Sequence, residues 1–122
     1  MILADTSIWI DFLRGRASGM RNLIEAGKIV MHPFVAAELA LRSIQDRRRT
    51  LATLDMLDQV NVARLNEVRR MVEAQSLYAK GIGLTDAHLV ASCLITPGTR
   101  IWTRDIRLER VAQLLGISAG QP

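Results

Sequence analysis

The sequence predicts an α/β fold with a central, mostly parallel sheet of four or five strands. Short aliphatic runs, such as residues 1–4 and 29–31, have the composition of buried strands. Longer segments in which apolar residues recur at helical spacing separate these runs. Strands that alternate with helices are typical of a parallel sheet that helices cover on both faces.

Turn and capping residues set the expected limits of each element. Thr6 or Ser7 can cap the first helix, Gly27 ends the second, and Pro33 suits the first turn of the third. The predicted helices are 6–13, 20–26, 34–44, 48–57, 65–80, 85–95 and 106–115. The predicted strands are 1–4, 29–31, 60–62 and 100–103, with a fifth, edge strand beginning at Ile117.

The length of 122 residues favours a single domain, 1–122, in which we find no internal repeat or linker. The N-terminus lacks the pattern of a signal peptide, and the longest nearly apolar run, 89–95, is far shorter than a membrane helix. We therefore expect a cytoplasmic protein without a membrane partner. Cys93, the one cysteine, is expected to be reduced and buried.

The basic residues favour a polyanionic partner. The chain has 16 Lys and Arg against 12 Asp and Glu, and all but Lys28 and Lys80 of the basic residues are arginine. Arginine binds phosphate through two parallel hydrogen bonds, which makes nucleic acid a reasonable partner. Solubility alone is an equally good explanation of the composition.

Four acidic residues lie within or directly beside apolar segments, where a carboxylate must be paired, protonated or bound to a cation. These residues are Asp5, Glu38, Asp86 and Asp105. Asp5 and Asp105 each follow a predicted strand, so both should point into the crevice at the carboxyl ends of a parallel sheet. Carboxylates without His or Cys ligands suit Mg²⁺, or Mn²⁺ in its place, and two such ions can activate water for attack on a phosphodiester.

The segments around these acids carry a family resemblance. ADTSIWIDFL, HPFVAAEL, LTDAHLVAS and WTRDIRL occur in the order found in PIN domains, and the chain resembles the VapC toxins of bacterial toxin–antitoxin pairs. The resemblance implies a three-layer α/β/α domain and a magnesium-dependent endoribonuclease that cuts structured RNA such as tRNA or rRNA. It also implies a homodimer, inhibition by a VapB antitoxin, and Asp5, Glu38, Asp86 and Asp105 as catalytic metal ligands.

One position departs from the family pattern. Many PIN domains carry a further acid two residues after the last Asp, but this chain has Arg107 there, so the number of ions stays open. Thr6, Ser7 and Thr103 lie beside the acids and can orient a ligand or water, or can serve as helix caps and strand-end bonds.

Arginines near the predicted crevice are candidates for RNA binding. Arg14 and Arg16 follow the first helix, and Arg104 adjoins Asp105. The run 47–49 is either an RNA clamp or, as we favour, a charged connection between helices.

Other polar and aromatic residues are given structural roles. We expect Trp9 and Trp102 in the core or at a dimer contact, His32 in a turn, and His88 on a different helix face from Asp86. The remaining acids are interpreted as solvated, namely Asp11, Glu25, Asp46, Asp55, Asp58, Glu67, Glu73 and Glu109.

Two other functional classes remain open. A noncatalytic nucleic-acid-binding module explains the arginines but leaves the buried acids without a role. A phosphatase or phosphotransfer domain has an acidic metal pocket. However, the first loop here reads Asp5, Thr6, Ser7 and lacks the second Asp of a haloacid-dehalogenase-like phosphatase. A response-regulator receiver would need a late lysine near its pocket, which this sequence does not offer.

Overall fold

Four short strands form one parallel sheet in the computed structural model, which describes residues 1–16 and 19–122. The strand order is β3-β2-β1-β4, and every pairing is parallel. The strands are β1 (Ile2–Ala4), β2 (Ile29–Met31), β3 (Asp58–Gln59) and β4 (Arg100–Trp102). The predicted α/β class with a parallel central sheet is confirmed.

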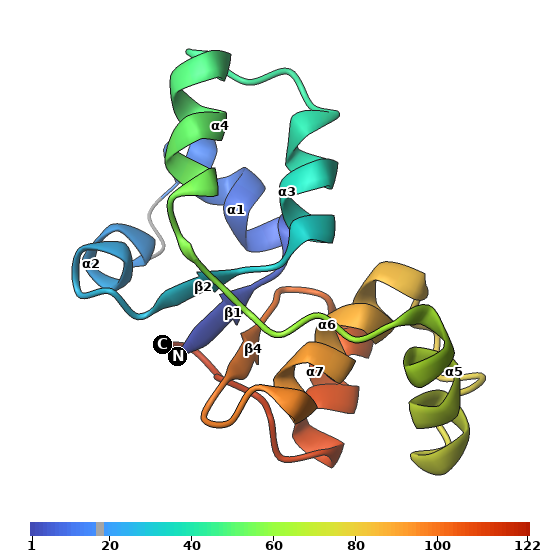
Figure 1. Ribbon diagram of the computed structural model, residues 1–122. Helices are drawn as coiled ribbons and strands as arrows, with labels where there is room; N and C mark the ends of the chain where they lie inside the picture. The colour runs from blue at the N-terminus through green and yellow to red at the C-terminus, as the bar shows by residue number, and fades with distance from the viewer. Residues whose placement is uncertain (17–18) are drawn as a thin grey trace.

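Helices cover the sheet on both sides, which gives three layers (Figure 1). The first group, α1, α3 and α4, packs together, and α1 also contacts β1. The second group contains α6 and α7, which contact β4, and α5, which packs on α6. The helices are α1 (Thr6–Leu13), α2 (Met20–Glu25), α3 (Pro33–Ala40), α4 (Arg47–Asp55), α5 (Leu65–Ala74), α6 (Leu84–Ile95) and α7 (Ile106–Leu114).

Burial of the strands agrees with a sheet that is covered on both faces. Successive side chains of a strand point to opposite faces, yet Leu3 and Ala4 are both completely buried. All three residues of β2 are buried as well. Trp9 and Trp102 lie in the same core, which confirms the core alternative for both.

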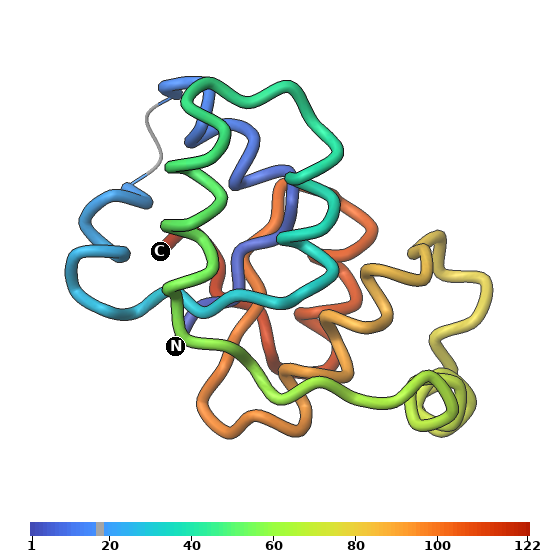
Figure 2. The backbone as a smooth tube through the Cα atoms, turned by 45° about the horizontal axis from the view of Figure 1, so that its top comes forward, coloured from blue at the N-terminus to red at the C-terminus, as the bar shows by residue number. Residues whose placement is uncertain are grey.

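The strand order agrees with the predicted position of a binding crevice at the end of two adjacent strands. The chain adds β2 and β3 on one side of β1 and then returns to add β4 on the other side (Figure 2). The strand order therefore reverses between β1 and β4, where α/β sheets bind ligands beyond the carboxyl ends of the strands. Ala4 pairs with Trp102 at the last step of this ladder, so Asp5 and Thr103 follow at the same edge.

Two predicted strands differ from the structure. The third strand is 58–59 and not 60–62. Val60 still donates its backbone N–H to the carbonyl oxygen of Met31 in β2 at 3.1 Å, but the strand pairing does not continue through Asn61 and Val62. The predicted fifth strand at Ile117 is reduced to a single bridge between Ile101 and Ser118.

Two predicted helices are too long, and others shift by one or two residues. The third helix ends at Ala40 and not at 44, because the guanidinium of Arg47 donates to the carbonyl oxygens of Ala40 and Arg42 and so caps the free carbonyl end. This contact supports the interpretation of Arg47 as part of a helix connection. The fifth helix ends at Ala74 and not at 80, because Ser76 adopts a left-handed φ of 53°.

Further local predictions are settled by the side chains. Asp5, rather than Thr6 or Ser7, caps α1 by accepting from the backbone of Ile8. Cys93 is buried and free, as expected. None of the helices in the described part of the chain combines the length and the apolar character that crossing a bilayer requires.

Candidate functional site

Asp5 lies at the carboxyl end of β1 and is held there from three sides. The residue is 6 % exposed. One carboxylate oxygen, Oδ1, accepts from the Ser7 hydroxyl at 2.5 Å and the Ile8 backbone N–H at 3.1 Å. The other, Oδ2, accepts from the hydroxyl of Thr103, which follows β4. These bonds fix the orientation of a carboxylate at the switch point of the sheet.

Glu38 reaches the same region from α3. Thr6, the first residue of α1, donates from its hydroxyl to Glu38 Oε2 at 3.2 Å. Because Thr6 directly follows Asp5 in the sequence, this bond links α3 to the start of α1 beside Asp5. The structure thus brings Thr6, Ser7 and Thr103 against the predicted acidic residues, each through a hydroxyl group.

Asp86 occupies the first turn of α6 and interacts electrostatically with the other three acids. Burial and repulsion from Asp105, Asp5 and Glu38 raise the pKa of Asp86 from 3.8 to about 6, although a backbone hydrogen bond from Gly83 opposes the rise. Burial is the largest cause. A carboxyl group whose charge is disfavoured in this way binds either a proton or a cation more readily than a solvated one.

Asp105 caps α7 at the end of β4. Its Oδ1 accepts from the backbone N–H groups of Arg107 and Leu108 at 2.8 and 3.1 Å. The backbone N–H of Asp105 donates to Thr103 Oγ1 at 3.0 Å. Thr103 therefore contacts both Asp5 and Asp105, and one hydroxyl couples the two strand ends.

The four acids influence one another electrostatically but do not converge on one point. Within residues 1–16 and 19–122, no group of three or more His, Cys, Asp or Glu side chains is close enough to hold a metal ion directly. None of the four acids takes part in an ion pair within these same ranges. All four supply oxygen atoms, which suits a hard divalent cation that keeps several water ligands, such as Mg²⁺. Their assignment as metal ligands stays a prediction.

The predicted RNA-binding arginines separate into two places. Arg16 and Arg104 line one cavity of about 950 Å³, together with Thr103. Arg14 lines a different cavity of about 590 Å³ between α1, α3 and the start of α4. The structure therefore brings Arg16 and Arg104 together but leaves Arg14 elsewhere.

Asp11 corrects the prediction of a solvated acid. Its side chain is buried and pairs with Arg16 and with Arg104. Because Ile10 and Phe12 flank it in the sequence, the criterion that selected Asp5 applied to Asp11 as well. The arginines beside Asp105 and after α1 gave no sign that they converge on one acid.

The histidines lie in the core and not among the acids. His32 is completely buried, and its Nδ1 accepts from the backbone N–H of Phe34 at 2.9 Å, so it caps α3 and is not part of a turn as predicted. The His88 ring packs against Phe34 with centroids 4.3 Å apart. Burial, together with His88, lowers the pKa of His32 to about 4, and burial lowers that of His88, so both imidazoles are neutral at pH 7.

Comparisons with known proteins agree with this arrangement. Residues 2–114 match the sequence model of the PIN domain. The chain is 38% identical over 121 residues to Ribonuclease VapC32 of Mycobacterium tuberculosis strain CDC 1551 / Oshkosh, covering 99% of this chain and 98% of that protein. The protein of the same name from strain ATCC 25618 / H37Rv matches with the same identity and coverage.

Proposed function

The chain belongs to the PIN-domain family, and from this membership we propose that it is a magnesium-dependent endoribonuclease toxin of a VapC type. The proposed substrate is structured RNA such as tRNA or rRNA. The relatives in Mycobacterium tuberculosis are ribonucleases by name and match nearly the whole chain. Their coverage supports the proposal over a noncatalytic binding module or a phosphatase.

One structural observation carries most weight. Asp86 is repelled by three other acids and forms no ion pair among the described residues, so an ion from solution or a proton would relieve its charge. Elsewhere in the molecule a buried acid, Asp11, does have basic partners. The unpaired acids support our proposal that a divalent cation binds at this end of the sheet.

The oxygen ligands proposed for the cation are those of Asp5, Glu38, Asp86 and Asp105, with Mn²⁺ as a substitute for Mg²⁺. A bound divalent ion lowers the pKa of a coordinated water and offsets charge that develops on the phosphate oxygens. The Ser7 and Thr103 hydroxyl groups hold the Asp5 carboxylate in one orientation. Thr6 does the same for Glu38.

The proposed reaction is hydrolysis of a phosphodiester bond. Asp5 and Asp86 position the water on one side of the scissile phosphate, and arginine side chains hold the neighbouring backbone. Proton uptake by Asp86 competes with binding of the cation, because both neutralise the same carboxylate. Activity should therefore fall as the pH drops below about 6.

The direct experiment compares the unmutated protein with Asp86→Ala on purified total RNA. Both are incubated with Mg²⁺ and with EDTA, and the fragments are resolved on a denaturing gel. Discrete fragments that form only with the unmutated protein and Mg²⁺ would establish the reaction. Fragments that persist in EDTA, or with Asp86→Ala, would refute the metal-dependent mechanism.

A cognate VapB antitoxin and a homodimer complete the proposal, and both come from the family resemblance. Light scattering after gel filtration measures the oligomeric state of the purified protein. Co-purification with the product of an adjacent gene, and loss of RNA cleavage in that complex, would identify the antitoxin.

A further inference from the structure

The buried acid Asp11 joins two arginines that come from distant parts of the chain. Its carboxylate receives Arg16 Nη1 on Oδ1 at 2.6 Å and Arg104 Nη1 on Oδ2. The side chain of Asp11 is 12 % exposed, whereas those of Arg16 and Arg104 are 59 % and 61 % exposed. The carboxylate is thus enclosed, and each guanidinium presents its outer side to solvent.

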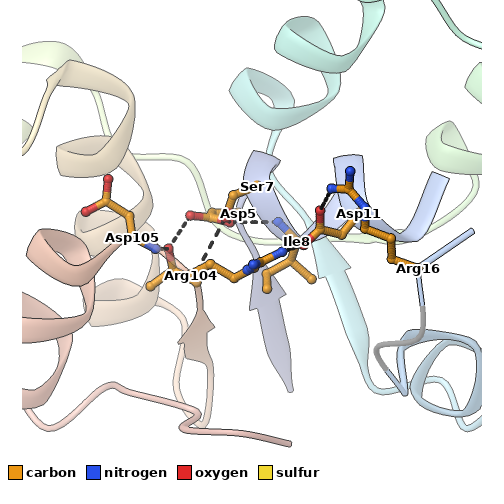
Figure 3. A network of polar contacts seen from close by, with 8 residues as sticks. Asp5, Ser7, Ile8, Asp11, Arg16, Arg104 and Asp105 are labelled. Carbon is orange, nitrogen blue, oxygen red and sulfur yellow. Dashed lines mark hydrogen bonds and ion pairs between the residues drawn. The ribbon is translucent and has the colours of Figure 1, made fainter. Parts of the chain in front are cut away.

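The pair of arginines lies directly beside the acidic crevice. Arg104 follows Thr103, and its backbone N–H lies 3.4 Å from Ser7 Oγ, which itself donates to Asp5. Figure 3 shows the Arg104 side chain extending from the neighbourhood of Asp5 toward Asp11, while Arg16 approaches Asp11 from the other side. Asp11 and Arg104 are 93 residues apart in the sequence, so the fold and not the local sequence brings them together.

A cavity lies beside the two arginines and shares one residue, Thr103, with the acidic site. Its volume is about 950 Å³, and its charged lining residues are Asp11, Arg16, Arg104, Glu109 and Arg110. Thr103 lines this cavity and also donates to Asp5, so the cavity and the predicted catalytic acid are one residue apart.

The chemistry of the arginines selects a phosphate-bearing ligand. A guanidinium has five N–H donors, and only Nη1 of each arginine is engaged with Asp11. The three charges sum to one positive charge, and the free N–H groups are presented in a fixed direction. Without Asp11, the two cations would repel each other and their long side chains would sample many rotamers.

We propose that Asp11 is a positioning residue that holds Arg16 and Arg104 as a clamp for RNA phosphates next to the scissile bond. This inference rests on the proposed ribonuclease function and deepens it. The alternative is a purely structural role, in which Asp11 ties α1 to the segment after β4.

The Asp11→Asn variant provides a decisive test, because net charge alone and loss of the clamp predict opposite changes in its affinity for RNA. The substitution raises the formal net charge of +4 by one, so a protein that attracts RNA by charge alone should bind more tightly. If Asp11 positions the clamp, binding should weaken in spite of the added charge. We expect the Kd for a short single-stranded RNA in EDTA to rise at least about fivefold.

Matched variants separate the clamp from general charge. Arg104→Gln should weaken binding similarly and lower the slope of log K against log salt by roughly 0.7. Arg104→Lys keeps the charge but loses the planar fork, so it should also bind weakly. Arg69→Gln removes an exposed arginine of α5, outside the cavity that Arg16 and Arg104 line, and should change the Kd by less than about twofold. Circular dichroism and urea denaturation check the fold of each variant, and the Arg104 variants decide the matter if Asp11→Asn does not fold.

Cleavage kinetics provide the second readout. For Asp11→Asn, KM should rise with kcat changed little, because the clamp binds backbone outside the reacting atoms. Unchanged or tighter RNA binding by Asp11→Asn and by Arg104→Lys would overturn the clamp and leave a structural ion pair. An unmutated protein that binds RNA but never cuts it would refute the ribonuclease, whereas weaker binding by Asp11→Asn would still support the clamp. If the unmutated protein binds neither this single-stranded RNA nor purified tRNA and rRNA, both proposals fail.

Discussion

Replacement of Asp86 by asparagine should stabilise the metal-free protein at neutral pH. The substitution keeps the size of the side chain and removes a charge that burial and three neighbouring acids disfavour. An asparagine amide carries no net charge, so it does not repel Asp5, Glu38 or Asp105. A residue that is proposed to be essential for catalysis therefore lowers the stability of the protein that contains it.

The pKa of Asp86 gives the magnitude. The rise from 3.8 to about 6 is roughly two pKa units, and each unit corresponds to about 1.36 kcal/mol. Because Asp86 retains contact with solvent, screening reduces this upper limit of about 3 kcal/mol, and we expect a gain of about 1–2 kcal/mol. For a chain of this length, the melting temperature should rise by roughly 3–8 °C.

The sign of the pH dependence follows from proton uptake. The pKa of Asp86 is higher in the folded than in the unfolded protein, so the folded state binds more protons between pH 3.8 and about 6. The free energy of unfolding of the unmutated protein should therefore increase as the pH falls through this window. The variant lacks this titration, so the two stability curves should differ most above pH 7 and converge near pH 4.

Urea denaturation in EDTA at several pH values from 4 to 8 measures this difference. Asp58→Asn, which changes an exposed acid of β3, is the matched control and should show no comparable gain. Addition of Mg²⁺ should stabilise the unmutated protein above pH 6 but not Asp86→Asn, which would narrow the gap. An Asp86→Asn variant that is no more stable at pH 8, or whose gain persists unchanged at pH 4, would refute the explanation.

Three further substitutions test other parts of the site and core. Asp5→Asn should lower Mg²⁺-dependent RNA cleavage, measured on gels, by at least about 100-fold. RNA binding in EDTA, measured by fluorescence anisotropy, should change less than about threefold. Retained cleavage would contradict the proposed role of Asp5. Thr103→Val removes the hydroxyl that contacts both Asp5 and Asp105. We expect roughly tenfold slower cleavage and a free energy of unfolding in urea that is lower by about 1–2 kcal/mol. Unchanged values of both quantities would contradict the coupling. Burial raises the pKa of Cys93 to about 12, so iodoacetamide should modify this thiol at pH 8 only when urea unfolds the chain; rapid modification of the folded protein would show that the thiol is accessible.

The sequence predicted the fold because local and global signals agree in most of the chain. The aliphatic strands next to Asp5 and Asp105 precede capped helices, and the parallel sheet follows from their alternation. The errors lie where tertiary contacts override local pattern. Val60 is a β-branched residue of the kind found in strands, but it lies just beyond the end of β3. Arg47 donates to the carbonyl oxygen of Ala40, the last residue of α3, which is seven residues earlier in the sequence.

The candidate site was predictable in its residue types but not in its interactions. The sequence identified Asp5, Glu38, Asp86 and Asp105, and their mutual influence appears only when α3 and α6 are packed beside the sheet. Likewise, the cap formed by Asp5 depends on the position of the Ile8 backbone, which the sequence does not specify.

Asp11 and Asp86 show why burial of an acid is an insufficient criterion for function. Both are carboxylates among apolar residues, yet Asp11 has two guanidinium partners, while Asp86 forms no ion pair in the described chain and is repelled by three acids. An acid that the protein already neutralises can orient its partners, whereas an acid that the protein leaves uncompensated needs an ion from outside. The two acids therefore differ in whether the folded chain supplies a basic partner. Asp11 has such partners and is proposed to hold the RNA-binding arginines, whereas Asp86 has none in an ion pair of the described chain and is proposed to bind metal.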